Sequence, residues 1–264
     1  MNKIAFIGTG NMGGAIVRAV CGVTQSENVY ISNRTAARSE ALAQECGCRV
    51  AKDNSACAQD AEFVFLGVKP YAVRDVLREI APALTKEQVI VSMAAGVESS
   101  AMREIVQDNP IVRILPNTPC AIGRGLVLIA PCGSVEQTKT DELAELLAPC
   151  GRVDFTDEAH ADAGMTVGGA TPAFVYQFIE ALADGGVLAG LSRADALSWA
   201  AQAVAGSAEM VLQSGKHPGQ LKDEVCSPGG STIEGIKTLE AHAFRAAAMK
   251  AVEAAYEKNK KLGK

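Results

Sequence analysis

A glycine-rich turn close to the amino terminus constrains the fold more than any other feature of the sequence. It reads GTGNMG over residues 8–13, directly after the apolar run Lys3–Ile7 and at the start of a helix-like stretch. A strand, turn and helix in this order are the setting that a dinucleotide-binding turn requires. Gly8 permits the tight turn, Gly10 lets a pyrophosphate approach the backbone, and the last glycine lets helix and strand pack. The alternative is a turn of the same shape that binds nothing.

Short apolar runs alternate with amphipathic stretches as far as about residue 155, which is typical of parallel strands joined by crossover helices. We expect strands at Lys3–Ile7, Asn28–Ser32, Phe63–Val68, Val89–Ser92, Ile111–Leu115, Leu126–Ala130 and Arg152–Phe155. We expect helices at Met12–Cys21, Ala36–Glu45, Ala72–Ile80, Ser99–Val106 and Val135–Leu147. Pro70 and Pro116 are expected in the loops that follow two of the strands.

The second half of the chain has a different character. After about Glu158 the β-branched runs disappear, and long alanine-rich stretches predict helices at Thr171–Gly190, at Arg193–Ser214 and from Phe244 onward. The sequence therefore predicts the α/β class, with an N-terminal Rossmann-like, mostly parallel sheet domain over residues 1–157. An all-helical C-terminal domain is expected over residues 158–264.

Charge and composition point to a small-molecule ligand. The formal net charge is −5, which argues against a nucleic-acid or anionic-membrane partner. No apolar run reaches the ~20 residues that span a bilayer, and the start of the chain lacks an export signal, so we expect a cytoplasmic protein. The eight cysteines and three histidines lack metal-ligand spacing, and we interpret the cysteines as reduced core thiols with no metal site.

The end of the second predicted strand carries no acidic residue. In NAD-binding proteins an acid at that position accepts the adenine ribose hydroxyls, but here the strand ends in Ser32, Asn33 and Arg34. A guanidinium beside a hydroxyl and an amide suits a 2′-phosphate, which a carboxylate would repel. The sequence therefore favours NADPH, with NADH as the alternative. A structural explanation is also open, in which Arg34 lies on the surface and Ser32 and Asn33 cap the next helix.

A second glycine pair precedes a helix near the carboxyl end. Residues 227–232 read SPGGST, and the two glycines would expose backbone amides at a helix N-terminus, as in a carboxylate or phosphate cradle. Ser231 and Glu234 also fit a capping box, which is a purely structural role. The residues alone do not decide between the two.

Six motifs occur in order along the chain: GTGNMG, FLGVKP, SMAAGV, RILPNTPC, ATPAF and HPGQLKDEVCSPGGST. Together they resemble the pyrroline-5-carboxylate reductases, and the resemblance covers the whole chain. It implies reduction of the cyclic imine 1-pyrroline-5-carboxylate to L-proline with NADPH or NADH, the last step of proline synthesis. It also implies a Rossmann domain followed by helices through which two chains intertwine into a homodimer, and in some members a higher assembly of dimers.

By position, the resemblance implies two sets of contacts. The cofactor residues would be Gly8, Gly10, Asn11, Met12, Ser32, Asn33, Arg34, Asn54, Val68, Lys69, Pro70, Ala94, Ala95 and Gly96. The substrate residues would be Glu158, Gly229, Gly230, Ser231 and Thr232, which favours the cradle at SPGGST. The family's SGSGPAY stretch reads GGATPAF over residues 168–174. Because the small residues are kept and the serines are not, we interpret it as a close-packing element.

We expect catalysis to depend mainly on alignment. The substrate carboxylate would dock on the amides of Gly230–Thr232, and the Thr232 hydroxyl, the expected catalytic group, would lie near the imine nitrogen. A β-hydroxyacid-type dehydrogenase is the alternative enzyme, but it needs a lysine on a central helix, and none occurs between Glu158 and Lys216. A non-catalytic NADP-sensing module is the other alternative, and it would not need the SPGGST segment.

Overall fold

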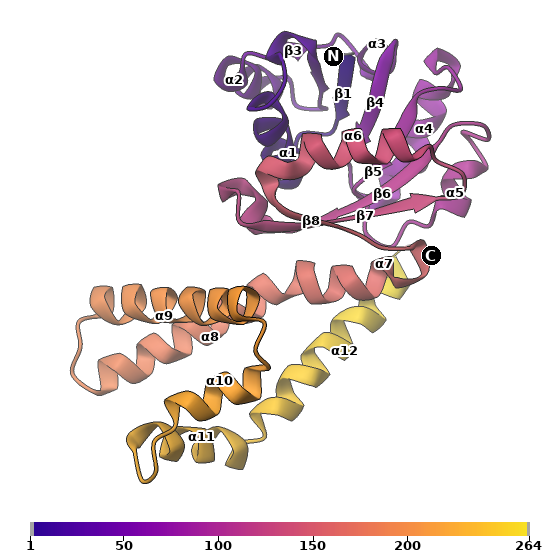
Figure 1. The fold of residues 1–264 in the computed structure, drawn as a ribbon. Helices are drawn as coiled ribbons and strands as arrows, with labels where there is room; N and C mark the ends of the chain where they lie inside the picture. Colours follow the sequence, from indigo (N-terminus) through magenta and orange to yellow (C-terminus); the bar gives the residue numbers. More distant parts are fainter. Residues whose placement is uncertain (1–2, 263–264) are drawn as a thin grey trace. The chain divides into compact units, whose positions relative to one another are not determined.

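The computed structural model describes residues 3–262, and residues 3–155 fold into an eight-stranded sheet (Figure 1). The strand order is β3-β2-β1-β4-β5-β6-β7-β8, and every neighbouring pair is parallel except β6 and β7. The strands are β1 (Lys3–Ile7), β2 (Val29–Ser32), β3 (Arg49–Val50), β4 (Ala61–Leu66), β5 (Val89–Ser92), β6 (Ile111–Pro116), β7 (Gly125–Cys132) and β8 (Gly151–Phe155). The predicted fold class is confirmed.

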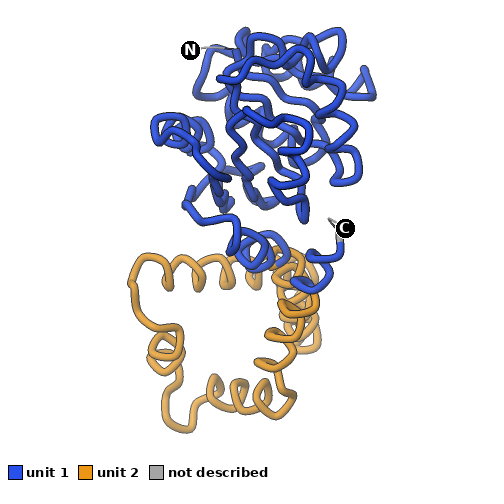
Figure 2. The backbone as a smooth tube through the Cα atoms, turned by 90° about the vertical axis from the view of Figure 1, so that its right-hand side faces the viewer, with its two compact units in different colours: residues 1–170, 255–264 blue, residues 171–254 orange. Residues whose placement is uncertain are grey.

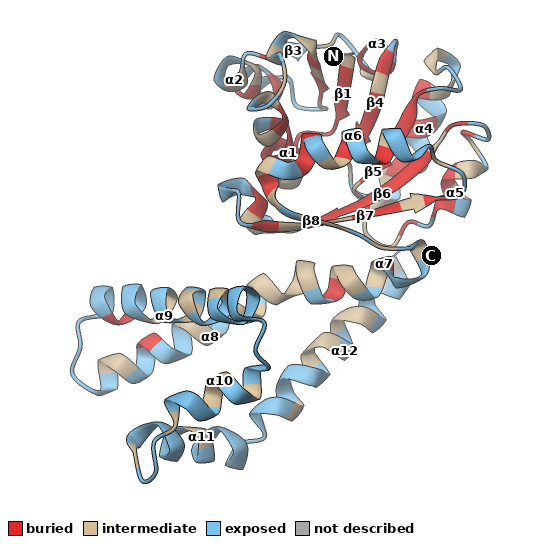
Figure 3. Ribbon diagram, in the orientation of Figure 1, coloured by how far each residue is buried: buried red, intermediate tan, exposed pale blue. Residues whose placement is uncertain are grey.

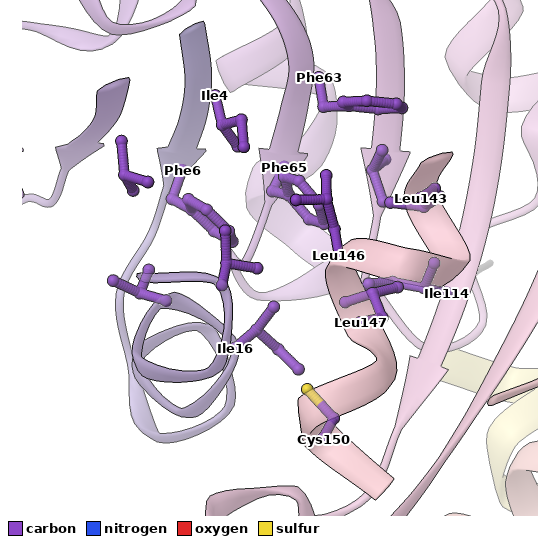
Figure 4. Close-up of a cluster of buried hydrophobic side chains, with 14 of the residues drawn as sticks. Ile4, Phe6, Ile16, Phe63, Phe65, Ile114, Leu143, Leu146, Leu147 and Cys150 are labelled. Carbon is purple, nitrogen blue, oxygen red and sulfur yellow. The ribbon is translucent and has the colours of Figure 1, made fainter. Parts of the chain in front are cut away.

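Helices cover both faces of the sheet. They are α1 (Asn11–Cys21), α2 (Ala36–Cys46), α3 (Asn54–Ala58), α4 (Val73–Ile80), α5 (Ser99–Arg103) and α6 (Gln137–Leu147). Successive side chains of a strand point to opposite faces, so Ile4 and Phe6 join the core under α1 and α6, whereas Ala5 and Ile7 join the core under α3 and α4. In the first core the rings of Phe6 and Phe65 stack 4.3 Å apart (Figure 4).

Three local predictions about the sheet region are wrong or incomplete. The sequence reading missed β3, whose two residues are both exposed, and it missed the short helix α3. Pro116 is the last residue of β6 and not part of the loop. Pairing with β5 stops at Arg113, and beyond it only β7 lies beside the strand. A proline is tolerated there because the strand has no partner on its β5 side at that point, so no backbone N–H is needed on that side.

The rest of the chain is helical. It contains α7 (Glu158–Met165), a π-helical turn at Thr166–Ala170, α8 (Thr171–Leu188), α9 (Arg193–Ser214), α10 (Pro218–Val225), α11 (Ser231–Ala241) and α12 (Phe244–Leu262). Helix α10 begins with Pro218 at its first helical position, and the ring of His217 accepts a hydrogen bond from the amide of Gly219. No helix within residues 3–262 is long and apolar enough to cross a bilayer.

The chain divides into two compact units (Figure 2). The first comprises the residues up to Ala170 together with the end of α12 from Ala255, and the second is Thr171–Ala254. The predicted domain boundary at residues 157 and 158 stays a prediction. Within Thr171–Ala254, only Ala183 and Ala196 are buried in a single chain (Figure 3). This unit therefore buries little apolar surface on its own.

The small residues before α8 serve close packing, as predicted for the stretch that lacks the family's serines. A Cβ atom added to Gly168 would lie 2.9 Å from a methyl of Leu126, and one added to Gly164 would lie 2.5 Å from a methyl of Leu128. Asn117 fastens the same turn, since its Nδ2 donates to the carbonyl of Gly168 over 2.9 Å. The turn therefore lies directly against β7.

Three glycines let three backbone segments pack directly against one another at the carboxyl end of β1. Gly8 has a φ of +91°, and the carbonyl oxygen of Gly8 lies 2.3 Å from where a Cβ of Gly13 would be and 2.2 Å from that of Gly67. The amide of Gly67 in turn donates to the carbonyl of Ile7 over 2.8 Å. Helix α1 can therefore begin directly against the strand ends only if these positions lack side chains.

Gly13→Ala should destabilise the protein, whereas Gly10→Ser should not. The alanine methyl would meet backbone that cannot move aside, which costs about 1–3 kcal/mol of unfolding free energy. A Cβ at Gly10 meets nothing within 4 Å, and serine is a better residue than glycine to precede a helix. Urea unfolding of both variants checks this. Equal unfolding midpoints for the two would contradict the conclusion that the backbone contact at Gly13 leaves no room for a side chain.

A buried arginine connects β6 to α7. The Arg113 side chain is 2% exposed, and its guanidinium lies 2.7 Å from Asp162 and 3.5 Å from Glu158. Glu158 also accepts hydrogen bonds from the amide and the hydroxyl of Ser99, at 2.7 and 2.6 Å. These bonds tie the start of α7 to both β6 and the start of α5.

Arg113→Met should lower the unfolding free energy by about 3 kcal/mol, because two partly buried carboxylates lose their cation. Arg152→Met is the matched control. The Arg152 side chain is 64% exposed and forms an ion pair with Asp154 on the same strand. Because this pair is open to solvent, its loss should cost at most about 1 kcal/mol. Denaturant titration of both variants measures the difference, and comparable losses would rule out a special contribution from the buried pair.

Candidate functional site

A cavity of about 1250 Å³ lies at the carboxyl ends of the parallel strands. Its walls come from the segments that follow β1, β2, β3, β4 and β5, with Thr118 and Ala121 from the segment after β6. The strand order reverses between β1 and β4, and ligands of open α/β sheets bind beside that point. The cavity therefore has the position expected of a nucleotide site.

The structure brings together almost all of the predicted cofactor residues. Those that line the cavity are Gly8, Gly10, Asn11, Met12, Ser32, Asn33, Arg34, Asn54, Val68, Lys69, Pro70, Ala94 and Ala95. Gly96 does not line it; with a φ of +72°, it instead turns the chain after Ala95. Residues from five separate strand ends thus form one surface.

The glycine-rich turn offers room and amides for an anion. Helix α1 begins at Asn11. Because the residue before it is Gly10, no side chain at that position caps the amides of the first turn. The first amides of a helix have no partner within the helix, and its dipole favours negative charge at this end. Since space beside Gly10 is open, a pyrophosphate fits here without displacing any side chain.

The end of β2 is uncharged, and the cavity that it lines holds three cations together with the carboxylates of Asp53 and Glu79. Ser32 donates a 2.7 Å hydrogen bond to Oδ1 of Asn54, and Arg34, Arg38 and Lys52 line the same cavity. The capping part of the structural alternative is wrong, because Thr35 is the residue that precedes α2 and no side chain caps that helix, but Arg34 does lie exposed on the surface. The cations leave the site able to bind a phosphate ester.

Several residues of the cavity were missed by the sequence reading: Arg38, Lys52, Gly67, Glu79, Met93 and Thr118. For Gly67 there was a signal, a glycine directly after an apolar strand within FLGVKP. For Lys52 the signal was weak, since it follows a strand of only two residues. For Glu79, on α4, there was none, because only the packing of α4 beside α3 brings it to the cavity.

The SPGGST segment forms a tight turn ahead of α11. Gly229 has a φ of +69°, and the amide of Gly230 donates to the carbonyl of Ser227 over 3.0 Å. The capping box is wrong, because Gly230 precedes the helix, Ser231 is already its first residue, and no side chain caps it. The amides of Ser231 and Thr232 therefore face outward at the helix N-terminus. The amide of Gly230, expected to bind substrate, is used within the turn.

Glu158 has partners inside the protein. Burial opposes its ionisation, but the hydrogen bonds from Ser99 and the charge of Arg113 outweigh burial, so the pKa of the Glu158 carboxyl lies below its usual range. It is thus a charged anchor between α5 and α7. Nothing in these contacts assigns it to a substrate.

Most of the cysteines lie in the interior of the sheet region. Cys48, Cys57, Cys120, Cys132 and Cys150 are buried, and burial raises the pKa of Cys57 to about 12. Cys21 and Cys46 are half-buried and pack against the first core, whereas Cys226 is half-buried and belongs to none of the cores. Within residues 3–262 no group of histidine, cysteine and acidic side chains is arranged to hold a metal ion.

Comparisons with known proteins identify the family. Residues 158–262 match the family described as pyrroline-5-carboxylate reductase dimerisation, and residues 3–96 match the one described as NADP oxidoreductase, coenzyme F420-dependent. The chain is 40% identical to the pyrroline-5-carboxylate reductase of Escherichia coli, over 99% of this chain and 98% of that protein.

Two solved structures have the same fold. The pyrroline carboxylate reductase of Plasmodium falciparum, solved with NADP bound, aligns over 100% of this chain and 98% of its own, with 32% identity and a TM-score of 0.88. The pyrroline-5-carboxylate reductase of Coxiella burnetii aligns over 100% and 99%, with 29% identity and a TM-score of 0.91. With identity and fold in agreement along its whole length, the chain belongs to the pyrroline-5-carboxylate reductase family.

Proposed function

We propose that the cavity beside Gly10 holds NAD(P)H and that the turn before α11 holds the carboxylate of the substrate. The enzyme reduces 1-pyrroline-5-carboxylate to L-proline with NAD(P)H, the last step of proline biosynthesis. A bound nicotinamide supplies hydride to the imine carbon of the substrate. The nitrogen of the C=N bond must also carry a proton, which the substrate brings with it in its iminium form, so the residues of this chain have mainly to position the reactants.

The glycine turn and its cavity carry the cofactor half of this proposal. Open space beside Gly10, free amides at the start of α1 and the cations Arg34, Arg38 and Lys52 fit a pyrophosphate and a 2′-phosphate. Gly8, Asn11, Met12, Asn33, Val68, Lys69, Pro70, Ala94 and Ala95 complete the proposed contacts, and Gly96 acts through the turn that it makes.

The substrate half rests on the amides of Ser231 and Thr232. They lie at the positive end of α11, where a carboxylate is favoured, and Gly229 and Gly230 keep the approach free of side chains. We propose that the Thr232 hydroxyl contacts the imine nitrogen. Glu158 enters the proposal as a residue that positions the start of α7, since its oxygens already bind Ser99.

Oxidation of NADPH in the presence of 1-pyrroline-5-carboxylate tests the reaction directly. The Gly10→Ser variant, which we expect to fold normally, should lose cofactor affinity because its side chain would enter the pyrophosphate space. The alternatives predict other outcomes. A β-hydroxyacid dehydrogenase would oxidise a hydroxy acid instead, and a sensing module would bind the cofactor without oxidising it.

Arg34→Ala should raise the KM for NADPH about tenfold or more and leave that for NADH nearly unchanged, because only the 2′-phosphate uses a guanidinium there. Arg38 and Lys52 line the same wall, so the loss should stay short of complete. Steady-state kinetics with both cofactors measures it. An equal change for NADPH and NADH would contradict the assignment.

Thr232→Ala should lower kcat/KM for the imine while the Kd for NADPH stays as in the wild type, since the hydroxyl is assigned to the substrate. Thr232→Ser keeps the oxygen and should be much milder. Kinetics and direct cofactor titration separate the two effects. An unchanged kcat/KM in the alanine variant would mean that Thr232 has no part in the reaction.

The enzyme is a homodimer, as its dimerisation domain indicates. We propose that dimers assemble further and that the substrate turn of one chain serves the cofactor of its partner. Sedimentation measures the assembly. The cytoplasmic location expected from the sequence stays a prediction, which cell fractionation tests.

Mixed refolding should reveal a shared site. Gly10→Asp disables the cofactor turn, and Gly230→Val with Thr232→Ala disables the substrate turn, since any Cβ at Gly230 would meet the Ser227 hydroxyl at 2.4 Å. Random pairing of two inactive chains should restore about a quarter of wild-type activity, because each mixed dimer then holds one intact site. If tagged mixed dimers form and stay inactive, each site belongs to one chain.

A further inference from the structure

A chain of two hydrogen bonds links the end of β2 to a carboxylate on α4. The Ser32 hydroxyl lies 2.7 Å from Oδ1 of Asn54, and Nδ2 of Asn54 lies 2.8 Å from a carboxylate oxygen of Glu79. All three residues line the cavity. The sequence reading included Ser32 and Asn54 among the cofactor residues, but not Glu79.

Glu79 fixes the direction of both bonds. An ionised carboxylate only accepts hydrogen bonds, so Asn54 must turn its NH₂ group toward Glu79 and its carbonyl oxygen toward Ser32. That carbonyl oxygen also only accepts, so the Ser32 hydroxyl must donate its single proton to it. What Ser32 has left for a ligand in the cavity is its lone pairs.

This polarity matters at the end of β2, where NAD-binding folds place a carboxylate that accepts the ribose hydroxyls. A ribose 2′-hydroxyl can donate to an accepting Ser32. A 2′-phosphate has no proton to give at neutral pH and needs donors instead. Ser32 in its observed state therefore suits NADH, whereas Arg34, Arg38 and Lys52 on the same cavity suit NADPH.

We infer that Glu79 is a specificity-determining residue, which holds Ser32 as a hydrogen-bond acceptor and so keeps the site able to bind NADH. The inference rests on the proposal that the adenosine end of the cofactor lies in this cavity. Glu79 does not touch the ribose in this arrangement. It acts through Asn54, as a positioning residue.

Glu79→Gln is the direct test. A glutamine amide can also donate, so Asn54 can turn over, direct its NH₂ group to Ser32 and release the serine proton toward a phosphate. The ratio of the Kd for NADPH to the Kd for NADH should fall about threefold to tenfold, the size of one added hydrogen bond. Nicotinamide fluorescence measures both constants without substrate. Glu79 is exposed, so the isosteric change leaves the core intact.

Two controls separate this polarity effect from the loss of one negative charge. Asp75→Asn removes a charge on the same helix, from a side chain that is 81% exposed and paired with Arg78, and it should not move the ratio beyond a small, salt-sensitive change. The second control combines Glu79→Gln with Ser32→Ala. Without the Ser32 hydroxyl, the orientation of Asn54 has no serine proton to direct, so Glu79→Gln should shift the ratio no more than Asp75→Asn does.

The outcomes are distinct. A shift from Glu79→Gln that requires Ser32 supports the inference. The same shift with and without Ser32, or no shift while Ser32→Ala itself weakens binding, overturns it and leaves the cofactor site standing. If Ser32→Ala and Arg34→Ala both leave the two Kd values unchanged, the cavity is not the adenosine site. The proposed cofactor site and the inference about Glu79 then both fail.

Discussion

The close approach of backbone to backbone at Gly8, Gly13 and Gly67 is the constraint on which the nucleotide half of this enzyme depends. Because no side chain separates the three segments, α1 begins directly above the ends of β1 and β4. The unpaired amides of α1 then face the point where the strand order reverses. The loops that follow the other strands close around that point, and their residues form the cavity.

Charged side chains of both signs line this cavity. The chain has the neutral hydroxyl of Ser32 at the end of β2, where NAD-binding folds place an acid, and Arg34, Arg38 and Lys52 line the same cavity. The carboxylate of Glu79 contacts Asn54, and Asn54 in turn contacts the Ser32 hydroxyl, so Asn54 lies between the carboxylate and the hydroxyl. Under the inference drawn above, the cations attract a phosphate while the orientation of Ser32 lets the same site bind a ribose hydroxyl.

The two units meet different physical demands. The unit that contains the sheet buries two apolar cores within one chain. The helices of Thr171–Ala254 leave most of their side chains exposed or half-buried in a single chain, which is the state expected of a region whose core is completed by a partner. Small residues at Gly164 and Gly168 let the chain turn tightly against β7 before it enters that region.

The sequence by itself determined the features that depend on local pattern. The alternation of apolar runs predicted seven of the strands, the glycine spacing predicted the turn beside Gly10, and the missing acid after β2 pointed to a phosphate ester. Only the tertiary structure decided which side chains meet. Glu79 reaches Asn54 across 25 residues, Glu158 reaches Ser99 across 59, and Ser231 enters α11 instead of capping it. Such contacts depend on how helices pack on the sheet, and no spacing along the chain encodes that packing.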